Sequence, residues 1–112
     1  MPKNISVIFK TIGVEMYGTI FNLKVIPGHE DDLINSMKST SAPPGAVAFF
    51  IMKPDNEEND LIAVAVFESK QDYLNNANRP EQHDAFVNMM THLQEEPTWK
   101  DGTYIILSLI HI

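Results

Sequence analysis

The stretch "FNLKVIPGHEDDL", residues 21–33, holds the end of a strand, a break and the start of a helix in direct succession. It overlaps a longer segment, residues 17–26, in which more apolar and less apolar side chains alternate, as in a β-strand. Pro27 and Gly28 stop that strand. Acidic residues come next, and because the helix dipole favours anions in a first turn, an amphipathic helix is predicted over residues 29–39.

Two nearly continuous apolar runs follow, "AVAFFIM" at residues 46–52 and "LIAVAVFE" at residues 61–68, on either side of the polar loop "KPDNEEND". Runs that are apolar on both faces are typical of strands in a sheet that is covered on both sides. The loop lacks the glycine and the terminal glutamate spacing of a calcium loop. We therefore interpret it as a solvated hairpin connection.

Two helices are predicted after the second apolar run. Ser69, with Asp72 three residues later, forms a capping-box-like start for a short helix. Pro80 is expected at the first position of a longer helix that runs roughly over residues 80–96. Apolar side chains in this helix recur on one broad stripe, which must pack against another layer of the protein.

The connection "LQEEPTWKDGTY", residues 93–104, contains the single tryptophan of the chain. Pro97 is expected to end the long helix, and Asp101-Gly102 to turn the chain into a final strand, "TYIILSLIHI" at residues 103–112. The short tether between these breaks should fold Trp99 onto an apolar surface, because burying an indole is worth about 2 to 3 kcal/mol. We expect its side chain on the side of the sheet that faces a partner subunit.

The order of elements is strand, helix, strand, strand, helices, strand. This α+β order, βαββαβ, predicts a ferredoxin-like fold in which helices cover one face of a four-stranded antiparallel sheet. The uncovered face receives apolar residues from both long runs, more than a monomer leaves in water. We therefore expect a symmetric homodimer that buries sheet against sheet. Residues 17–112 form the domain, and residues 1–16 are an N-terminal arm or an extra strand.

Composition excludes several classes of function. The chain has 15 acidic and 8 basic residues and a net charge of −7, which repels nucleic acid and anionic membrane surfaces. It contains no cysteine, so disulfides and thiol nucleophiles are absent. No apolar stretch has the length of a membrane span or the form of a signal peptide, and we expect a cytoplasmic protein.

Three stretches together resemble the antibiotic biosynthesis monooxygenase superfamily, the dimeric α/β barrels. They are "FNLKVIPGHEDDL", "VAVFESKQDYLNNANRPEQHDAF" and "LQEEPTWKDGTY", and the resemblance spans about residues 17–107. It implies the fold, the homodimer and a pocket between sheet and helices in each subunit. It implies less about activity, because the superfamily includes cofactor-free oxygenases of polycyclic aromatics, heme-degrading enzymes, isomerases and dehydratases.

For heme degradation, the resemblance implies three residues: an Asn on the first strand, a Trp in the short helix after the third strand and a His on the next helix. Matching on the Pro-Gly turn puts Phe21 or Asn22 at the Asn position. Matching on "ESKQ" puts Asn76 at the Trp position and Ala85 or Phe86 at the His position. At most one of the three residues is present, so heme degradation is not expected, and no cofactor is expected.

His83 and Tyr73 are the candidate catalytic residues. His83 precedes Phe86 by three positions on the edge of the apolar stripe, so its imidazole could accept a proton from a phenolic substrate near neutral pH. Tyr73 would orient the substrate by hydrogen bonding. The structural alternative for His83 is a partly buried or solvent-bonded side chain without a catalytic role.

Phe21, Phe86 and Met90 are the candidate substrate-binding residues, together with Asn22. Aromatic and Met linings suit flat apolar ligands, although such stripes also form plain cores. Asn22 is expected to face the dimer interface, and its amide would reach a ligand only if the faces of the strand are reversed. The histidines show no metal-ligand spacing, so no metal site is expected.

These features favour a small-molecule enzyme, a cofactor-independent monooxygenase that acts on an aromatic or quinol-like compound. The substrate would supply the electrons to oxygen, and the protein would bind, desolvate and deprotonate it. The alternative is a non-catalytic dimer that binds a small ligand or serves in a stress response. A His83 that solvent reaches favours the first function, and one that is packed over favours the second.

Overall fold

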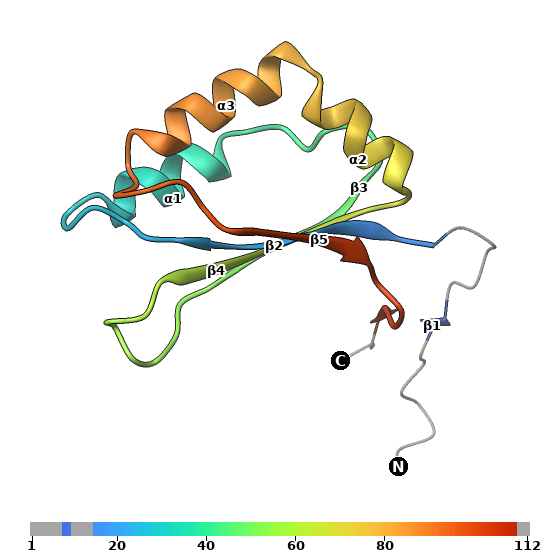
Figure 1. Ribbon diagram of the computed structural model, residues 1–112, viewed down its shortest axis with the longest axis horizontal. Coiled ribbons are helices and arrows are strands. Elements are labelled where there is room, and N and C mark those ends of the chain that lie inside the picture. The colour runs from blue at the N-terminus through green and yellow to red at the C-terminus, as the bar shows by residue number, and fades with distance from the viewer. Residues whose placement is uncertain (1–7, 10–14, 110–112) are drawn as a thin grey trace.

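The computed structural model describes residues 8–9 and 15–109 of the 112-residue chain. Figure 1 shows its helices and strands along the chain. In chain order they are β1 (Ile8–Phe9), β2 (Tyr17–Leu23), α1 (Glu30–Lys38), β3 (Ala46–Met52), β4 (Leu61–Phe67), α2 (Lys70–Ala77), α3 (Pro80–Met90), β5 (Trp99–Thr103) and β6 (Ser108–Leu109).

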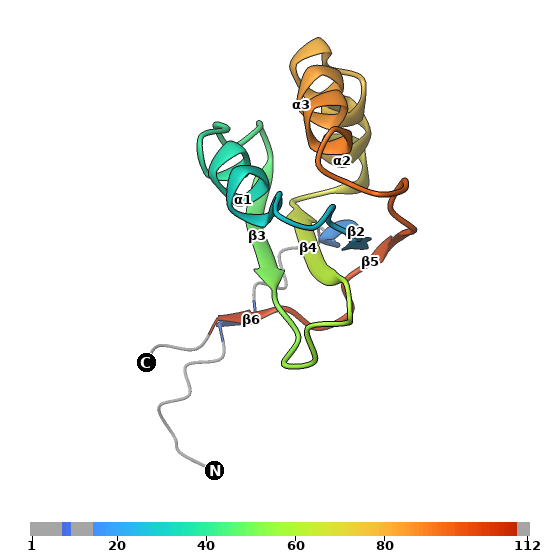
Figure 2. The same ribbon diagram turned by 90° about the vertical axis from the view of Figure 1, so that its left-hand side faces the viewer.

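Strands β3, β4, β2 and β5 form one antiparallel sheet in that spatial order. The helices α1, α2 and α3 all lie on the same face of this sheet, with α1 beside the α2–α3 pair (Figure 2). The predicted ferredoxin-like βαββαβ fold with a four-stranded antiparallel sheet is confirmed. None of the helices in the described part of the chain is long and apolar enough to cross a membrane.

Local signals in the sequence account for where the helices begin. Gly28 has φ +88°, and the His29 N–H donates to the Ile26 carbonyl at 2.9 Å, which closes a tight turn before α1. Acidic residues 30–32 fill the first turn of α1, as predicted. The Ser69 hydroxyl accepts from the Asp72 N–H at 3.1 Å and caps α2. Pro80 opens α3, also as predicted.

Helix α3 ends at Met90, six residues before the predicted end. The next N–H groups bind carbonyls three residues back, including His92 to Met89 at 3.0 Å, which is a tightened last turn. The chain then pairs with the end of β2: Leu93 forms an antiparallel bridge with Val25, and the Gln94 N–H donates to the Lys24 carbonyl at 2.8 Å. Pairing with the sheet therefore ends the helix before Pro97 does.

The predicted turn at Asp101-Gly102 is wrong, and the predicted strand is not continuous over its described residues, 103–109. Asp101 and Gly102 lie within β5, where they pair with Thr19 and Gly18 of β2. Within the described part of the predicted strand, Thr103 ends β5 and only β6 is a further strand. The open edge of β2 needs hydrogen-bond partners, and an extended backbone supplies them whatever its side chains.

Residues 1–16 were expected to form either an arm across the domain or an extra strand. Residues Ile8–Phe9 form strand β1, which pairs antiparallel with Ser108–Leu109 of β6. The two strands make a separate two-stranded sheet. Residues 1–7 and 10–14, the rest of that arm, lie outside the described residues, as do residues 110–112 of the predicted last strand.

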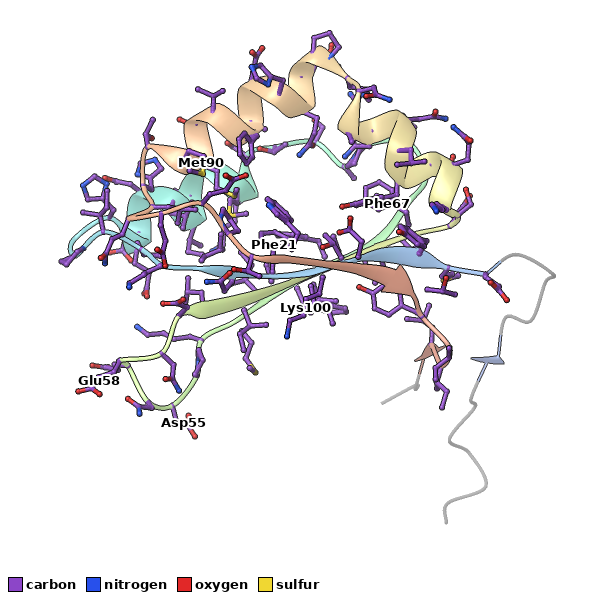
Figure 3. All side chains as sticks on the ribbon, viewed as in Figure 1. Phe21, Asp55, Glu58, Phe67, Met90 and Lys100 are labelled. Carbon is purple, nitrogen blue, oxygen red and sulfur yellow. The ribbon has the colours of Figure 1, made fainter. Side chains whose placement is uncertain are left out.

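The two faces of the main sheet differ in burial. The face toward the helices carries a core of buried residues, and Figure 3 shows Phe21 on this side and Lys100 on the other. Its members are Phe21, Leu23, Leu33, Leu61, Ala63, Met89 and Leu93. We call the side opposite the helices the open face. On it, Ile20 is 41% and Phe50 59% exposed, and both lie opposite Val64 in neighbouring strands.

Tyr104 closes the end of the sheet where β5 leaves it. Its N–H donates to the Met16 carbonyl at 2.8 Å, and its hydroxyl donates to the carbonyl of Ala65 at 2.9 Å. A Cβ atom at Gly18 would lie 1.9 Å from that same Ala65 oxygen and 3.1 Å from the Tyr104 ring. The close packing of these three residues therefore requires glycine at position 18.

We predict that Gly18→Ala lowers the free energy of unfolding by about 1–3 kcal/mol or more, because the clash is with backbone that cannot rotate away. Gly102 is the matched control, since it pairs with Gly18 across β2 and β5 and a Cβ there meets open space. Gly102→Ala should change stability by less than about 0.5 kcal/mol. Urea unfolding followed by circular dichroism measures both, and equal effects would contradict this packing.

Candidate functional site

The floor of the candidate site is the helix-side face of β2 and β4. Tyr17, Thr19 and Phe21 alternate on this face of β2, and in register Thr19 lies opposite Ala65 while Phe21 lies opposite Ala63. Two alanines thus occupy the middle of the sheet, between larger side chains on either side. Aromatic side chains gather above these small residues at both ends of the floor.

Four aromatic side chains, which we call the aromatic cluster, gather above the outer end of this floor: Phe21, Phe49, Phe86 and Trp99. The ring of Phe21 lies 4.4 Å from that of Trp99 and 6.5 Å from that of Phe49, centre to centre. Phe86 of α3 lies 6.4 Å from Trp99. These distances are typical of favourable aromatic contacts. Of the predicted binding residues, Phe21 and Phe86 are therefore brought together.

Trp99 folds back onto an apolar surface, as expected, but on the other side of the sheet from the one expected. It lies opposite Phe21 on β5 and packs against Phe21 and Phe86, so it faces the helices of its own chain and not the open face. Its side chain remains 39% exposed in the single chain. The expectation failed because the strand begins at Trp99 itself, which sets the face of that residue by the register of β5.

An apolar groove runs between α1 and the strands β3 and β4. It has a volume of about 390 Å³ and is lined by Ile34, Met37, Phe49, Ile51 and Leu61, with Glu30, Lys38 and Lys53 at its rim. Phe49 belongs both to this groove and to the aromatic cluster. The groove therefore borders the aromatic cluster at Phe49, and its size suits a small flat apolar ligand.

One ion pair lies at the rim of the apolar groove. Lys53 Nζ lies 3.1 Å from Glu30 Oε2, and the hydrogen bond to Glu30, followed by the charge of that carboxylate, raises the pKa of Lys53. The pair is exposed, so it contributes little to stability. The two opposite charges of the pair offset each other, and the residues that line the interior of the groove are apolar.

Tyr73 is the centre of a second group at the other end of the floor. Its ring lies 5.4 Å from Tyr17 and 5.6 Å from Phe67, and its hydroxyl donates to Asp101 Oδ1 at 3.0 Å. Burial, and then the hydrogen bond and charge of Asp101, raise the pKa of Tyr73 to about 12. Tyr73 is therefore a neutral hydrogen-bond donor at physiological pH, which suits an orienting role and excludes a basic one.

Thr19 supplies a buried hydroxyl between the two groups of aromatic residues. Thr19 is only 3% exposed, and its Oγ1 has no full hydrogen bond with any residue in the described part of the chain. It lies near enough to the Tyr73 hydroxyl to lower the pKa of that phenol slightly, against the larger effects that raise it. A buried hydroxyl without a partner is costly, and a polar atom of a ligand would relieve that cost.

His83 and Met90 lie on α3 at different depths. Met90 is half-buried and packs against the core next to Phe86. His83 is exposed, one turn before Phe86, and is not among the residues that line the apolar groove or contact Tyr73. The structure thus does not bring the two candidate catalytic residues together, although solvent reaches the imidazole.

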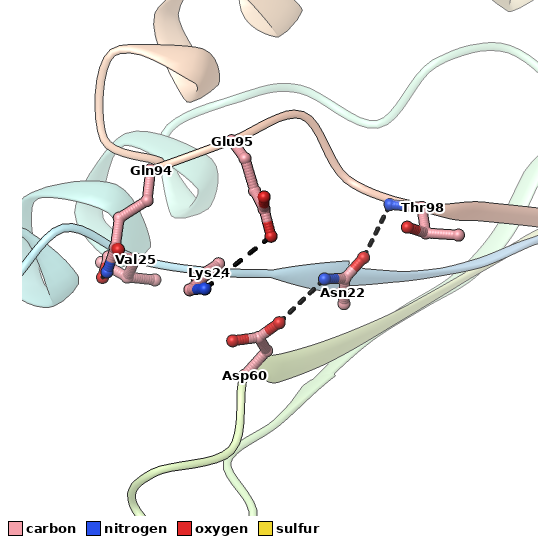
Figure 4. A network of polar contacts seen from close by, with 7 residues as sticks. All are labelled: Asn22, Lys24, Val25, Asp60, Gln94, Glu95 and Thr98. Carbon is pink, nitrogen blue, oxygen red and sulfur yellow. Dashed lines mark hydrogen bonds and ion pairs between the residues drawn. The ribbon is translucent and has the colours of Figure 1, made fainter.

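Asn22 lies on the opposite side of β2 from Phe21, and both ends of its amide are bonded (Figure 4). Its Nδ2 donates to Asp60 Oδ2 at 2.8 Å, and its Oδ1 accepts from the Thr98 N–H at 2.6 Å. These bonds hold the β3–β4 hairpin and the start of β5 against β2. Asn22 therefore lies on the side of β2 away from the helices, as expected, and its amide holds neighbouring segments of the chain together.

Neighbouring contacts extend this network along the same edge (Figure 4). Lys24 Nζ lies 3.9 Å from Glu95 Oε1, and Gln94 Nε2 donates to the Val25 carbonyl at 3.0 Å. The segment between α3 and β5 is thus attached to β2 at successive points. This attachment positions Trp99 above Phe21.

The fold has many counterparts among solved structures. A provisionally named antibiotic biosynthesis monooxygenase from Chloroflexus aurantiacus J-10-fl superimposes with a TM-score of 0.69 at 19% identity, over 86% of this chain and 99% of that one. SnoaB from Streptomyces nogalater, a cofactor-independent oxygenase, gives a TM-score of 0.58 at 12% identity, over 83% and 92%. The chain has the fold of the antibiotic biosynthesis monooxygenases.

A dimeric ferredoxin-like protein of unknown function from Thermobifida fusca YX has the same fold, with a TM-score of 0.67 at 11% identity over 81% of this chain and 92% of that one. No protein-family model and no curated protein matches the sequence. At these identities the comparisons establish the architecture. The chemistry must be argued from the residues of this chain.

We predict that Tyr73 titrates near pH 12 in the folded protein, above the ordinary value of about 10. Because this pKa is raised, the native state still holds the phenol proton at pH values where the unfolded state has lost it. The stabilisation that the protonated phenol gives is fully present below pH 10 and is lost as the pH rises toward 12. The ultraviolet titration curve of Tyr73→Phe is subtracted from that of the wild type, and the difference reports the titration of the Tyr73 phenol. Asp101→Asn should lower its pKa but leave it above 10, since burial is the larger cause.

Proposed function

We propose that this chain is a cofactor-independent monooxygenase of an aromatic or quinol-like small molecule. The observation that carries the proposal is the apolar groove, whose wall residue Phe49 is also a member of the aromatic cluster. The fold shared with SnoaB supports the same reaction class. The proposal includes membership of the antibiotic biosynthesis monooxygenase superfamily and an aromatic or quinol-like substrate.

The reaction needs no electron donor other than its substrate. An electron-rich aromatic with an activated ring CH₂ loses a proton to a base, and the resulting carbanion passes electrons to O₂. A carbon–oxygen bond forms, and the hydroperoxide then loses water to leave a carbonyl, so that SH₂ and O₂ give S=O and H₂O. The protein must bind the substrate, exclude water and accept a proton.

Residues of this chain have distinct tasks in the proposed reaction. The walls of the apolar groove and the aromatic cluster would desolvate the ring. Tyr73, held neutral by its raised pKa, would exchange its bond to Asp101 for a hydrogen bond donated to a substrate oxygen. His83 is the proposed proton acceptor, because solvent reaches its imidazole on α3 and the same helix carries Phe86 of the aromatic cluster. The His83 imidazole would act on the part of a substrate that extends from the aromatic cluster past Phe86.

The proposal includes a homodimer that buries the open face of the sheet. Ile20, Val64 and Phe50 lie side by side across three strands on that face, and Met52 beside them is 55% exposed. An apolar row of this kind is stable in water when it is covered. A second copy of the chain covers it symmetrically, and the dimeric protein from Thermobifida fusca supports that choice.

A second function, binding without chemistry, is favoured by the position of His83. The titratable side chains at the apolar groove are Glu30, Lys38 and Lys53, and two of these form an ion pair. None of the groove-lining residues is a histidine. A dimer that stores or senses an apolar ligand needs the groove and the open face, and does not need a base.

Phe49 and Phe50 give a matched test of the two surfaces, since they are neighbours on β3 that face the groove and the open face. The wild type should have a mass of about twice 12.7 kDa by light scattering. Phe50→Lys should give a monomer, because it places a charge in the buried sheet contact. Phe49→Lys should stay dimeric and lose binding of an aromatic probe such as anthrone. A wild-type monomer would contradict the proposed assembly.

Oxygen uptake tests the chemistry. Chelator-treated protein should consume O₂ with anthrone, which has an activated ring CH₂, and should use one O₂ for each substrate molecule converted. His83→Gln should lower kcat by about 10²-fold or more while the dissociation constant for the product is unchanged, because only proton transfer is lost. Asp84→Asn, an exposed neighbour on the same helix, is the control and should retain full activity. Binding of the probes without any O₂ uptake would establish the second function instead.

A further inference from the structure

Two histidines that lie far apart in the sequence meet beside the apolar groove. His29 Nδ1 and His92 Nδ1 are 3.1 Å apart, and the ring centres are 5.4 Å apart. His29 precedes α1 and His92 follows α3, so the contact links the start of one helix to the end of the other. Both side chains are half-buried, which separates them from the exposed His83.

The backbone around Ile26 holds both histidines in place. The Ile26 N–H donates to the His92 carbonyl at 2.9 Å, and the Ile26 carbonyl accepts from the His29 N–H at 2.9 Å. Gly28, with φ +88°, allows the turn that brings His29 back toward Ile26. Residues on both sides of the pair are thus joined through one peptide segment. The two imidazoles are positioned by main-chain hydrogen bonds and do not depend on flexible side chains alone.

The geometry points to a binding site for a divalent transition-metal ion between the two imidazoles. Two nitrogens bound to one tetrahedral ion at 2.0–2.1 Å are roughly 3.3 Å apart, close to the separation of the two Nδ1 atoms. Without a metal, the contact requires that one Nδ1 donate its proton to the other, and the ion would replace that shared proton. We propose Zn²⁺, Ni²⁺ or Cu²⁺ as the occupants, since imidazole suits these ions and not Mg²⁺ or Ca²⁺.

The charges around the pair are compatible with a cation. The carbonyl end of α3 lies just before His92 and is the negative end of the helix dipole. The positive end of α1 lies at His29, but Glu30, Asp31 and Asp32 follow it directly and oppose its field. No cluster of three or more His, Cys, Asp or Glu side chains suited to a metal occurs in the described part of the chain. Water would therefore complete the coordination of an ion held by two protein ligands.

A metal at this place would join α1 to α3. Helix α1 forms one wall of the apolar groove, and α3 carries Phe86 of the aromatic cluster. These helices lie side by side above the sheet (Figure 2). The ion would hold these two helices at a fixed separation, and this effect does not depend on whether the protein is an enzyme.

Calorimetric titration of untagged, chelator-treated protein with NiCl₂ tests the site. We expect one Ni²⁺ for each chain and a higher melting temperature with Ni²⁺ or Zn²⁺ than with Mg²⁺, because the ion binds the native state. His29→Gln and His92→Gln should each weaken Ni²⁺ binding by about tenfold or more, since one of two protein ligands is lost. His83→Gln is the matched control and should bind Ni²⁺ as the wild type does.

A spectroscopic measurement on the wild type covers the case in which a variant fails to fold. Substoichiometric Ni²⁺ is paramagnetic and should broaden the amide signals of Ile26, His29 and His92 before those of other residues. Equal Ni²⁺ affinity in the wild type and both variants, or broadening that begins elsewhere, would mean an adventitious ion only and would overturn the proposal. Absence of Ni²⁺ binding by the wild type would overturn it as well. Neither result bears on oxygen uptake, which tests the proposed function separately.

Discussion

The hydrogen-bonded ladders on the two sides of strand β2 are the constraint on which the candidate site depends. One ladder pairs β2 with β4 and the other pairs it with β5, and together they set which side chains share a level above the sheet. Phe21 is thereby placed beside Trp99 and Ala63. A shift of either ladder by one residue would turn every side chain of the shifted strand to the other face. The aromatic cluster therefore exists because these registers are fixed.

Contacts outside the ladder hold the register of β5. The Asn22 amide binds the Thr98 N–H at one end of the strand, and the Tyr104 hydroxyl binds the Ala65 carbonyl beyond the other end. Both contacts use polar groups on the side away from the helices or at the margin of the sheet. This arrangement leaves the helix side of β5 free for Trp99 and for Asp101, which meets Tyr73.

The first three quarters of the fold could be predicted from the sequence because local signals and tertiary pairing agree there. The Pro-Gly turn, the Ser69 cap and Pro80 each act on their own neighbours, and β3 and β4 match the two apolar runs. The last quarter could not, because there the two disagree. The polar stretch Trp99–Thr103 forms the strand that the more apolar residues after it were expected to form, since it is the stretch that reaches the open edge of β2.

Much of the candidate site could not be predicted from the sequence, for related reasons. Tyr73 and Phe86 follow from helix periodicity, but nothing local to Thr19 or Asp101 indicates that they adjoin Tyr73. The contact between His29 and His92 spans 63 residues and has no metal-ligand spacing that a sequence pattern could reveal. It depends on the early end of α3, which itself results from pairing with the sheet.

Strand β3 shows why alternation alone does not identify the groove. Every one of its seven residues is apolar, so the sequence offers no reason to place Phe49 toward the helices and Phe50 away from them. The register with β4 shifts between Ala46 and Ala48, a bulge that leaves Val47 without a partner and sets the faces of the residues after it. Both faces of β3 are apolar and have different surroundings: one lines the groove, and the other belongs to the open face of the sheet. The requirement for two apolar faces on one strand removes the polar positions by which a sequence pattern would distinguish them.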